Sequence, residues 1–586
     1  MNGNELLWPR GNPLGALDAS LAEEDLELRR LCLLLFPSLG SDGAMAFAAS
    51  LLTDDPETIR LRQRTLEDLL ARPDLCRALE TLLGLVDALA FCDKGMRENQ
   101  SALQLSRLDT TLDGVKKAVL RLGKDISRQG AEILEEAGAD NRYAKLLRFT
   151  HFRRRLLRLY TQAVTLIHDS TRNEDFAGEP LRALRAWAEA CYVRDGIPET
   201  ARALEGLDRE WKGVASFAVD VCLDSRRNIT GLELAEVRET PYAAPGMLEG
   251  AGSGEAREGI TSLLAFPQTG AAPAFQEYLL SAAGYEVRGK LTKLRDSLMK
   301  LPLTGLEELL SFREALLFYT GAAAFAEKLK ARGSAVCAPK LTEDRVFSFR
   351  EARLPEQTCT GALPVPNDLT LPLGGSILLT GPNSSGKTCC LIMAGQLLFL
   401  GQLGCLIPAA EGAFSPRDRL LTLFAAGESE TGEDSRMGLE VQRIRLLRSQ
   451  MTPRSLLLLN EPMTSTSALE GGKICVELLA DLAEKGIPAI LVTHFNHIWG
   501  DLRAAFDAAG KGDRLQSLVM TARETPVGLR YLYRLEEAPP PPSSHARAVV
   551  AEKGVRLEDM VASLAGRGLD MRPGDPGWER VRRGAV

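Results

Sequence analysis

The octapeptide GPNSSGKT at residues 381–388 constrains the fold more than any other feature of this 586-residue chain. It matches the pattern G-x-x-x-x-G-K-T, follows the apolar run SILLT at residues 376–380, and precedes a long apolar segment. A strand, a glycine-rich turn and a helix in this order form a phosphate-binding loop at a helix N-terminus. The alternative, a chance glycine-rich turn, does not account for the strand and the helix on either side.

Each part of this loop has an expected role in holding a nucleotide. The glycines allow backbone N–H groups to surround a phosphate, Lys387 reaches the β- and γ-phosphate oxygens, and the Thr388 hydroxyl binds Mg²⁺. ATP and Mg²⁺ are therefore the expected cofactors. The expected nucleotide-binding residues are Gly381, Pro382, Asn383, Ser384, Ser385, Gly386, Lys387 and Thr388.

Two further apolar runs also end in polar residues, SLLLLNE at residues 455–461 and AILVTH at residues 489–494. In an open parallel sheet the carboxyl ends of the strands line one crevice, so these ends should converge on the nucleotide. The residues expected there are Thr380, Asn460, Glu461, Thr493 and His494. For Glu461 the alternative is a residue that merely caps a loop.

Outside these motifs, the pattern of apolar and polar residues divides the chain into four parts. Residues 41–340 are expected to be helical almost throughout, with a glycine- and proline-rich loop or hinge near 241–273 and no dense strand pattern. Residues 341–540 have the short apolar runs of an α/β domain. Residues 1–40 form an N-terminal segment, and 541–586 form a tail with a short helix near 556–564. The helical runs expected in the first half are 55–70, 116–137, 143–170, 181–194 and 304–332.

Composition and charge exclude several classes of protein. The chain has 71 Lys and Arg against 78 Asp and Glu, which argues against a uniformly basic surface but allows a local basic patch. Eleven cysteines without a CxxC pair indicate neither a zinc ribbon nor a disulfide framework. The N-terminus lacks a continuous apolar signal, and the apolar segment at 389–408 is interrupted by Gln396 and Gln402. A cytoplasmic protein without a membrane partner is expected.

Several motifs in order resemble the MutS family of DNA mismatch repair ATPases, a branch of the ABC ATPase superfamily. They are VPNDLTL at 365–371, LLTGPNSSGKT at 378–388, EDSRMGLE at 433–440, LLLLNEPMTSTSALEG at 456–471 and VTHF at 492–495. A weaker match at residues 51–75 is similar to the start of the family's helical core domain. The implied fold is multidomain, with a mostly α-helical core and lever domain followed by an α/β P-loop ATPase domain of the ABC type.

The resemblance also implies roles for individual residues in a homodimer. Ser435 of one subunit would reach the γ-phosphate held by the other, Glu461 would align the attacking water as general base, and His494 would sense the γ-phosphate. Without the resemblance, Ser435 reads as part of a solvated acidic loop.

Two departures from the family pattern matter. The family strand usually ends in Asp-Glu, whereas this chain has Asn460 before Glu461. We still expect Thr388 and Asn460 to form the metal site, but a neutral amide is a weaker partner for Mg²⁺ and its water than a carboxylate, so turnover should be slow. Only about 40 residues precede the helical part, so the expectation is a short form without the family's mismatch-reading domain.

The best candidate for DNA contact is the segment at residues 142–160, which has seven Lys or Arg residues and no acid. The residues expected to neutralise phosphates are Arg148, Arg153, Arg154, Arg155 and Arg158. The alternative is a helix whose basic face is solvated or pairs with Glu132, Glu135 and Glu136.

The function expected from these features is an ATPase that binds mismatched, branched or distorted DNA as a nucleotide-gated homodimer in repair or recombination, with repair proteins as further partners. The alternative is an ATP-switched scaffold that regulates protein partners without binding DNA. The nucleotide subunit of a membrane transporter is disfavoured, because no LSGGQ-like signature occurs and the long helical half would be unexplained.

Overall fold

The structure is a computed structural model in which the chain forms two compact units, each treated by itself below. The helical unit takes its described residues from Asp74–Asp175 and Leu181–Leu316. The sheet unit takes its own from Trp8–Pro73, Phe176–Pro180 and Leu317–Val586. The residues that the structure describes are 17–100, 142–210, 216–223, 225, 229–238, 287–344, 346–424, 436–525 and 528–541. The expected features at 116–137, 241–273 and 556–564, and Ser435, lie outside them.

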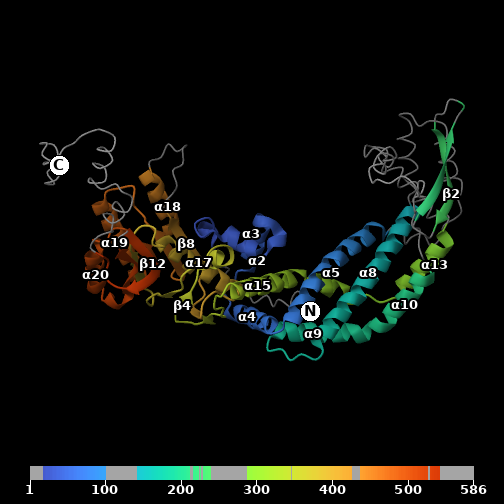
Figure 1. The fold of residues 1–586 in the computed structure, drawn as a ribbon, viewed down its shortest axis with the longest axis horizontal. Coiled ribbons are helices and arrows are strands. Elements are labelled where there is room, and N and C mark those ends of the chain that lie inside the picture. Colours follow the sequence, from blue (N-terminus) through green and yellow to red (C-terminus); the bar gives the residue numbers. More distant parts are fainter. Residues whose placement is uncertain are drawn as a thin grey trace. The chain divides into compact units, whose positions relative to one another are not determined.

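Long amphipathic helices build the helical unit. Figure 1 shows α5 and α8 side by side, and Phe152 of α8 stacks edge-on against Phe91 of α5 with ring centroids 6.0 Å apart. Leucines of α8, α10 and α13 form a shared apolar core. The helices of this unit are α5 (Pro73–Glu98), α8 (Arg142–Thr171), α9 (Glu179–Arg194), α10 (Ile197–Glu210), α13 (Arg288–Met299), α14 (Leu306–Ser311) and the start of α15 (Arg313–Ala331).

The prediction of a helical first half is wrong at one place. Strands β1 (Ser216–Leu223) and β2 (Ile229–Arg238) form an antiparallel hairpin with two irregularities in its register. The alternation of apolar residues in β1, which includes Val219 and Val221, is the period-two pattern of a strand, but the apolar residues of β2 do not keep this alternation. The predicted helix at 304–332 is likewise two helices, α14 and α15.

A buried carboxylate ties several elements of the helical unit together. Asp195, which is only 2% exposed, accepts hydrogen bonds from the Tyr160 hydroxyl at 2.5 Å and from the backbone N–H of Thr304 at 3.1 Å. The Tyr160 hydroxyl in turn accepts from the N–H of Gly305 at 3.1 Å. Burial by itself would raise the pKa of Asp195, but the hydrogen bonds from Thr304 and Tyr160 outweigh burial and lower it. The ionised carboxylate therefore belongs to the folded state.

We expect Asp195→Asn to destabilise the helical unit by about 2 kcal/mol, because a neutral amide replaces an acceptor of charge-assisted hydrogen bonds. Denaturant unfolding followed by circular dichroism measures the change. Since folding lowers the pKa of Asp195 below 3.8, the stabilisation is present above that pH and is lost as the pH falls through the folded-state value. Glu199→Ala, which removes an exposed ion pair with Arg202, is the control and should change stability by less than about 0.5 kcal/mol. An equal loss in both variants would contradict the prediction.

Two sheets form the framework of the sheet unit. In the larger sheet the strand order is β12-β11-β6-β10-β9-β8, in which β12 alone runs antiparallel to its neighbour. Its strands are β6 (Ser376–Thr380), β8 (Arg419–Phe424), β9 (Ser455–Asn460), β10 (Ala489–Val492), β11 (Leu515–Thr525) and β12 (Gly528–Glu537). The smaller sheet has the order β3-β7-β4-β5 and consists of β3 (Lys340–Leu341), β4 (Phe347–Ala352), β5 (Asn367–Thr370) and β7 (Glu411–Phe414).

Helices cover both faces of the larger sheet, because its central strands are apolar on both sides. Leu457 and Leu459 of β9 belong to a core shared with α19 and α20, whereas Leu458 lies against Gly395 of α17. This arrangement confirms the mixed helix and sheet predicted for the second half and its three strands β6, β9 and β10. The helices of the unit are α2 (Leu28–Leu35), α3 (Gly40–Leu51), α4 (Pro56–Leu70), α16 (Pro355–Thr360), α17 (Lys387–Leu403), α18 (Arg436–Gln450), α19 (Ala468–Lys485), α20 (Ile498–Ala508) and the rest of α15.

The division into units differs from the boundary expected near residue 340, because residues 17–73 belong to the sheet unit. The two glutamines that interrupt the apolar helix α17 explain the packing: Gln396 donates to the carbonyl of Leu26 at 2.9 Å, and Gln402 donates to that of Thr53 at 3.1 Å. Helix α17 is thus buried between the sheet and the N-terminal part. Among the described residues no single helix is long and apolar enough to cross a membrane. Helix α2 and the segment Pro37–Leu51 meet these two criteria only when they are taken together, and a bend of 108° separates them.

Candidate functional site

The loop at residues 381–386 joins β6 to α17, as its sequence predicts. Gly381 and Gly386 have φ of +138° and +98°, which favour glycine over any other residue. A Cβ on Gly381 would also lie 2.7 Å from the carbonyl oxygen of Met520 in β11, so the neighbouring strand leaves no room for a side chain. Gly386 is the N-cap of α17, which directs the N-terminal end of this helix at the loop. The local geometry suits an anion.

The Lys387 ammonium lies inside the loop and is nearly buried. Its Nζ donates to the carbonyls of Gly381 at 3.1 Å and Pro382 at 3.0 Å. Burial lowers the pKa of Lys387, while the negative charge of Glu461 acts in the opposite direction. Two uncharged carbonyls compensate a buried ammonium poorly, so an anionic phosphate is a stronger partner for Lys387 than the loop itself.

Two buried hydroxyls at the loop have no partner. Among the described residues, Ser385 Oγ and Thr380 Oγ1 are buried without a hydrogen bond. Buried polar atoms are nearly always paired in native proteins, so such orphans indicate a ligand or water. Phosphate oxygens supply acceptors for both, and this chemistry fits the nucleotide that the sequence predicts.

The ends of the three predicted strands meet at one edge of the sheet, as predicted. Val492 of β10 is in register with Leu379 of β6 and with Asn460 of β9. One residue further on, the N–H of Glu461 donates to the carbonyl of Val492 at 2.9 Å, and the N–H of Thr493 donates to that of Leu379 at 3.2 Å. Thr380, Asn460, Glu461, Thr493 and His494 therefore lie along the edge next to the loop.

The two residues expected to hold Mg²⁺ touch each other. The Thr388 hydroxyl donates to Oδ1 of Asn460 at 3.3 Å. A hydroxyl and an amide oxygen are ligands that Mg²⁺ accepts, and both leave room for the waters that this ion retains. The pair has no negative charge, so the charge for binding the metal must come from the phosphates and from nearby Glu461.

Glu461 and His494 differ in how firmly they are held. Glu461 has φ of +50° and Met463 has φ of +62°, which is unfavourable for side chains of this size and is typical of functional segments. The His494 ring is exposed and leans on that of Phe495, with the centroids 4.5 Å apart. The backbone at Glu461 is thus constrained, while the ring of His494 is exposed at the sheet edge, where a ligand can reach it.

A cleft of about 810 Å³ continues from the loop. It is lined by Lys387, Thr388 and Glu461 and also by residues that the sequence analysis did not assign to the site, among them Leu354, Pro364, Met520 and Tyr533. Asn367, another of these, holds β5 to β12: its side chain donates to the carbonyl of Tyr533 at 3.0 Å and accepts from the N–H of Leu535 at 2.7 Å. The motif VPNDLTL includes Asn367, but no sequence signal indicates Tyr533.

Tyr533 is the aromatic side chain of this cleft. Its φ is +55°, it is 45% exposed, and its ring lies about 3.4 Å from the position that a Cβ on Gly386 would take. An exposed aromatic ring held in an unfavourable backbone conformation beside the glycine-rich loop is well placed for the apolar or aromatic part of a ligand.

Three of the five arginines predicted to bind DNA have partners within the helical unit. Arg153 donates to the carbonyl of Leu301 at 2.9 Å, and Arg154 and Arg158 both form ion pairs with Asp208. Arg155 is exposed and Arg148 is half-buried. The partner is Asp208 of α10, whereas the glutamates at 132–136 considered from the sequence lie outside the described residues. DNA contact by these arginines stays a prediction.

Comparisons with known proteins agree with the motifs. The family model MutS domain V matches residues 377–556. The curated relatives include proteins named DNA mismatch repair protein MutS from Synechococcus sp. (strain CC9902), 30% identical over 203 residues, and from Thermus thermophilus, 30% identical over 188 residues. These matches cover 34% and 32% of this chain and 22% of each relative, so the chain spans about a fifth of the length of the relatives it matches. The resemblance to the MutS family is thereby confirmed for this part of the chain.

Proposed function

We propose that this protein binds ATP with Mg²⁺ and hydrolyses it slowly, as a MutS-like ATPase of the cytoplasm with an ABC-type P-loop domain. The observation that carries the proposal is the grouping at one sheet edge of a buried loop lysine, the Thr388–Asn460 contact and Glu461. A structural loop would not require an unpaired Ser385 hydroxyl and a buried Lys387 ammonium beside a large cleft.

The site suggests a division of labour along the nucleotide. The loop N–H groups, Lys387 and Ser385 bind the phosphates, while Thr388 and Asn460 hold the ion. Mg²⁺, when bound, neutralises phosphate charge and orients the terminal phosphate. Glu461 aligns water as general base, and His494 senses the terminal phosphate. The resemblance adds a homodimer in which Ser435 of one subunit completes the site of the other.

Tyr533→Ala should raise the dissociation constant for ATP about two- to tenfold, because a stacked aromatic ring contributes roughly 0.5–1.5 kcal/mol beyond its buried area. Equilibrium binding of a fluorescent ATP analogue measures the effect. Tyr533→Phe is the matched control, because it keeps the ring and loses only the hydroxyl, so its affinity should equal that of the unaltered protein. An unchanged affinity in Tyr533→Ala would place the base elsewhere.

Asn460→Asp should lower the Mg²⁺ concentration needed for half-maximal turnover by about tenfold and raise the turnover rate. A carboxylate adds negative charge to the Thr388 contact, and changes to the groups that hold or orient a metal ion typically alter its affinity by 10- to 100-fold. A Mg²⁺ titration of phosphate release at saturating ATP provides the measurement. If both quantities stay unchanged, Asn460 does not act on the metal.

The proposed ligand of the ATPase is DNA that is mismatched, branched or distorted. The helical units of the homodimer would bind it in repair or recombination. Its test is equilibrium binding to matched homoduplex, mismatched and branched DNA, with and without ATP, at two salt concentrations. This proposal is supported if the affinity depends on DNA structure, changes with ATP and falls as the salt concentration rises.

A second candidate, a nucleotide-switched scaffold for protein partners, is favoured by the charges of the helical unit. Arg153, Arg154 and Arg158 are engaged within the unit, and residues 216–238 of the hairpin carry four acids against three arginines. Weak DNA binding without structural preference would favour this candidate over the first.

A further inference from the structure

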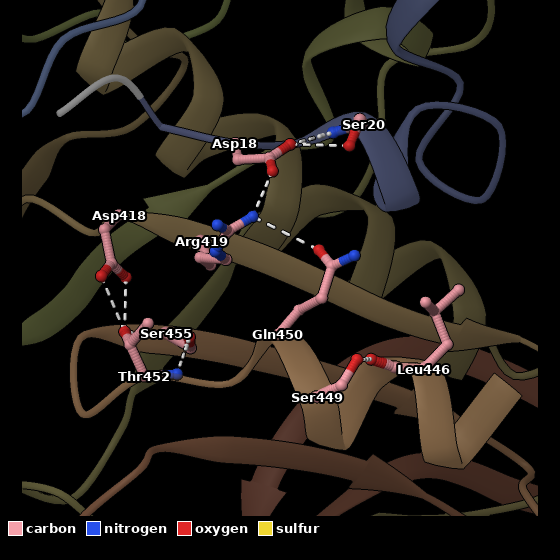
Figure 2. Close-up of polar contacts among 9 residues, drawn as sticks. All are labelled: Asp18, Ser20, Asp418, Arg419, Leu446, Ser449, Gln450, Thr452 and Ser455. Carbon is pink, nitrogen blue, oxygen red and sulfur yellow. Dashed lines mark hydrogen bonds and ion pairs between the residues drawn. The ribbon is translucent and has the colours of Figure 1, made fainter.

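A short N-terminal segment, residues 17–27, lies along the open edge of the larger sheet. Asp18 forms a parallel bridge with Arg419 of β8: its N–H donates to the carbonyl of Asp418 at 2.9 Å, and its carbonyl accepts from the N–H of Leu420 at 3.0 Å. Figure 2 shows the Asp18 carboxylate against the Arg419 guanidinium, which also donates to Oε1 of Gln450 in α18 at 3.3 Å. The segment therefore covers β8 and is connected to the end of α18.

A second carboxylate of this edge segment contacts α18 further along. Oδ2 of Asp25 accepts from the Thr422 hydroxyl of β8 at 2.6 Å and from Nη2 of Arg443 in α18 at 3.2 Å. The other terminal nitrogen of Arg443, Nη1, donates to the carbonyl of Phe424, the last residue of β8, at 2.8 Å. Asp25 is mostly shielded from solvent, so this charge-assisted contact is screened less than an exposed pair. Arg443 thus fastens α18 to the sheet edge with Asp25 as its anion.

Helix α18 also contacts the segment that follows Glu461, the proposed general base, through Glu440. Glu440, one turn before Arg443, is 6% exposed and accepts from the Ser465 hydroxyl at 2.7 Å. Ser465 lies four residues after Glu461, beyond the unfavourable backbone angles at Glu461 and Met463. A shift or rotation of α18 would therefore displace the chain that holds Glu461.

We propose that Asp25 is a positioning residue for ATP hydrolysis: it holds Arg443, Arg443 holds α18, and Glu440 of α18 holds the segment after Glu461 in place. This inference rests on the proposed ATPase activity and adds the N-terminal segment to the machinery that orients its general base. Catalysis is sensitive to such placement, because a displacement of about 1 Å can lower a rate by 100-fold, whereas nucleotide affinity depends on the loop. Asp25 does not line the cleft, and its hydrogen bonds go to Thr422 and Arg443.

The test compares Asp25→Ala, Asp25→Asn, the single variants Asp25→Arg and Arg443→Asp, and the exchanged pair that combines these last two, all in the full chain. We expect Asp25→Ala to lower kcat about tenfold while the dissociation constant for a fluorescent ATP analogue changes less than about twofold. Asp25→Asn, which keeps the hydrogen bond from Thr422 and loses the charge, should lower kcat by about threefold. The exchanged pair should regain part of the rate lost in the single variants, which a general loss of stability would not produce.

Arg350→Ala is the matched control, because Arg350 forms an exposed ion pair with Glu411 on the smaller sheet of the same unit. Its kcat and affinity should equal those of the unaltered protein. Unchanged kcat in both Asp25 variants, or an exchanged pair no faster than the single variants, would overturn the positioning role. An unaltered protein that binds no nucleotide or releases no phosphate would instead overturn the proposed function itself.

Discussion

Lys387→Ala is expected to weaken ATP binding by about 100-fold or more and to abolish turnover. The Lys387 ammonium is nearly buried inside the loop, where two carbonyls are its hydrogen-bond acceptors. A phosphate exchanges these neutral partners for charged ones, and hydrogen bonds to charged groups contribute roughly 1.5–3 kcal/mol each. Removal of the ammonium also leaves the phosphate charge without its cation. Equilibrium binding of a fluorescent ATP analogue and phosphate release measure the two losses.

The control for this variant is Lys473→Ala, which removes an exposed ammonium from α19 away from the cleft and should change neither quantity. Far-ultraviolet circular dichroism checks that Lys387→Ala still folds. We expect its stability to change little, because the loss of the hydrogen bonds to the Gly381 and Pro382 carbonyls is offset by the removal of a buried charge. Unaltered ATP affinity in a folded Lys387→Ala protein would exclude the loop as the nucleotide site.

Arg62→Met is expected to destabilise the sheet unit by about 2–4 kcal/mol, the largest stability effect predicted for this chain, because two buried carbonyls lose their donor at roughly 1–3 kcal/mol each. Arg62 is 3% exposed, and its Nη1 donates to the carbonyl of Leu51 at 2.6 Å and to that of Leu403 at 3.0 Å. These carbonyls belong to the last residues of α3 and α17, where helices leave acceptors unsatisfied and their dipoles attract a cation. The guanidinium also lies 5.5 Å from the ring centroid of Phe318.

Methionine fills a similar volume but has no N–H group, so the buried carbonyls at both helix ends lose their hydrogen-bond donor. Burial lowers the pKa of Arg62 to about 10, so the side chain remains charged at neutral pH in the folded protein. Denaturant unfolding at pH 7 measures the loss, with Arg64→Ala on the exposed face of the same helix as control. A loss below about 1 kcal/mol would show that Arg62 does not join α4 to α17.

Part of the fold and of the site follows from local sequence. The strand β6, the glycine loop and α17 were predictable because a phosphate-binding loop needs glycines where φ is positive and a lysine at a set spacing. The edge formed by Thr380, Asn460, Glu461 and Thr493 was predictable as well, because the ends of parallel strands must align. Asp55 caps α4 as its position before Pro56 indicates, accepting from the N–H groups of Glu57 and Thr58.

Contacts between residues far apart in the chain were not predictable in this way. Tyr533 enters the cleft because Asn367 holds its carbonyl across 166 residues, and no local pattern encodes that contact. Arg153, Arg154 and Arg158 read as a basic patch because their partners, Leu301 and Asp208, lie on other helices. The hairpin β1–β2 was missed because the apolar residues of β2 do not alternate regularly and the pairing register is interrupted twice.

The sequence by itself determined the motifs on which the proposal rests: the glycine-rich loop with Lys387, a neutral Asn460 beside Glu461, and the resemblance to the MutS family. These features depend on residue type and on spacing along the chain, so they can be recognised from a short stretch of sequence. The tertiary structure alone decided which groups complete the site and which are occupied elsewhere. Residues 17–73 join the sheet unit through contacts of Arg62, Asp18 and Asp25. A buried charge needs hydrogen-bond partners and an open strand edge needs cover, and here residues far apart in the sequence supply both.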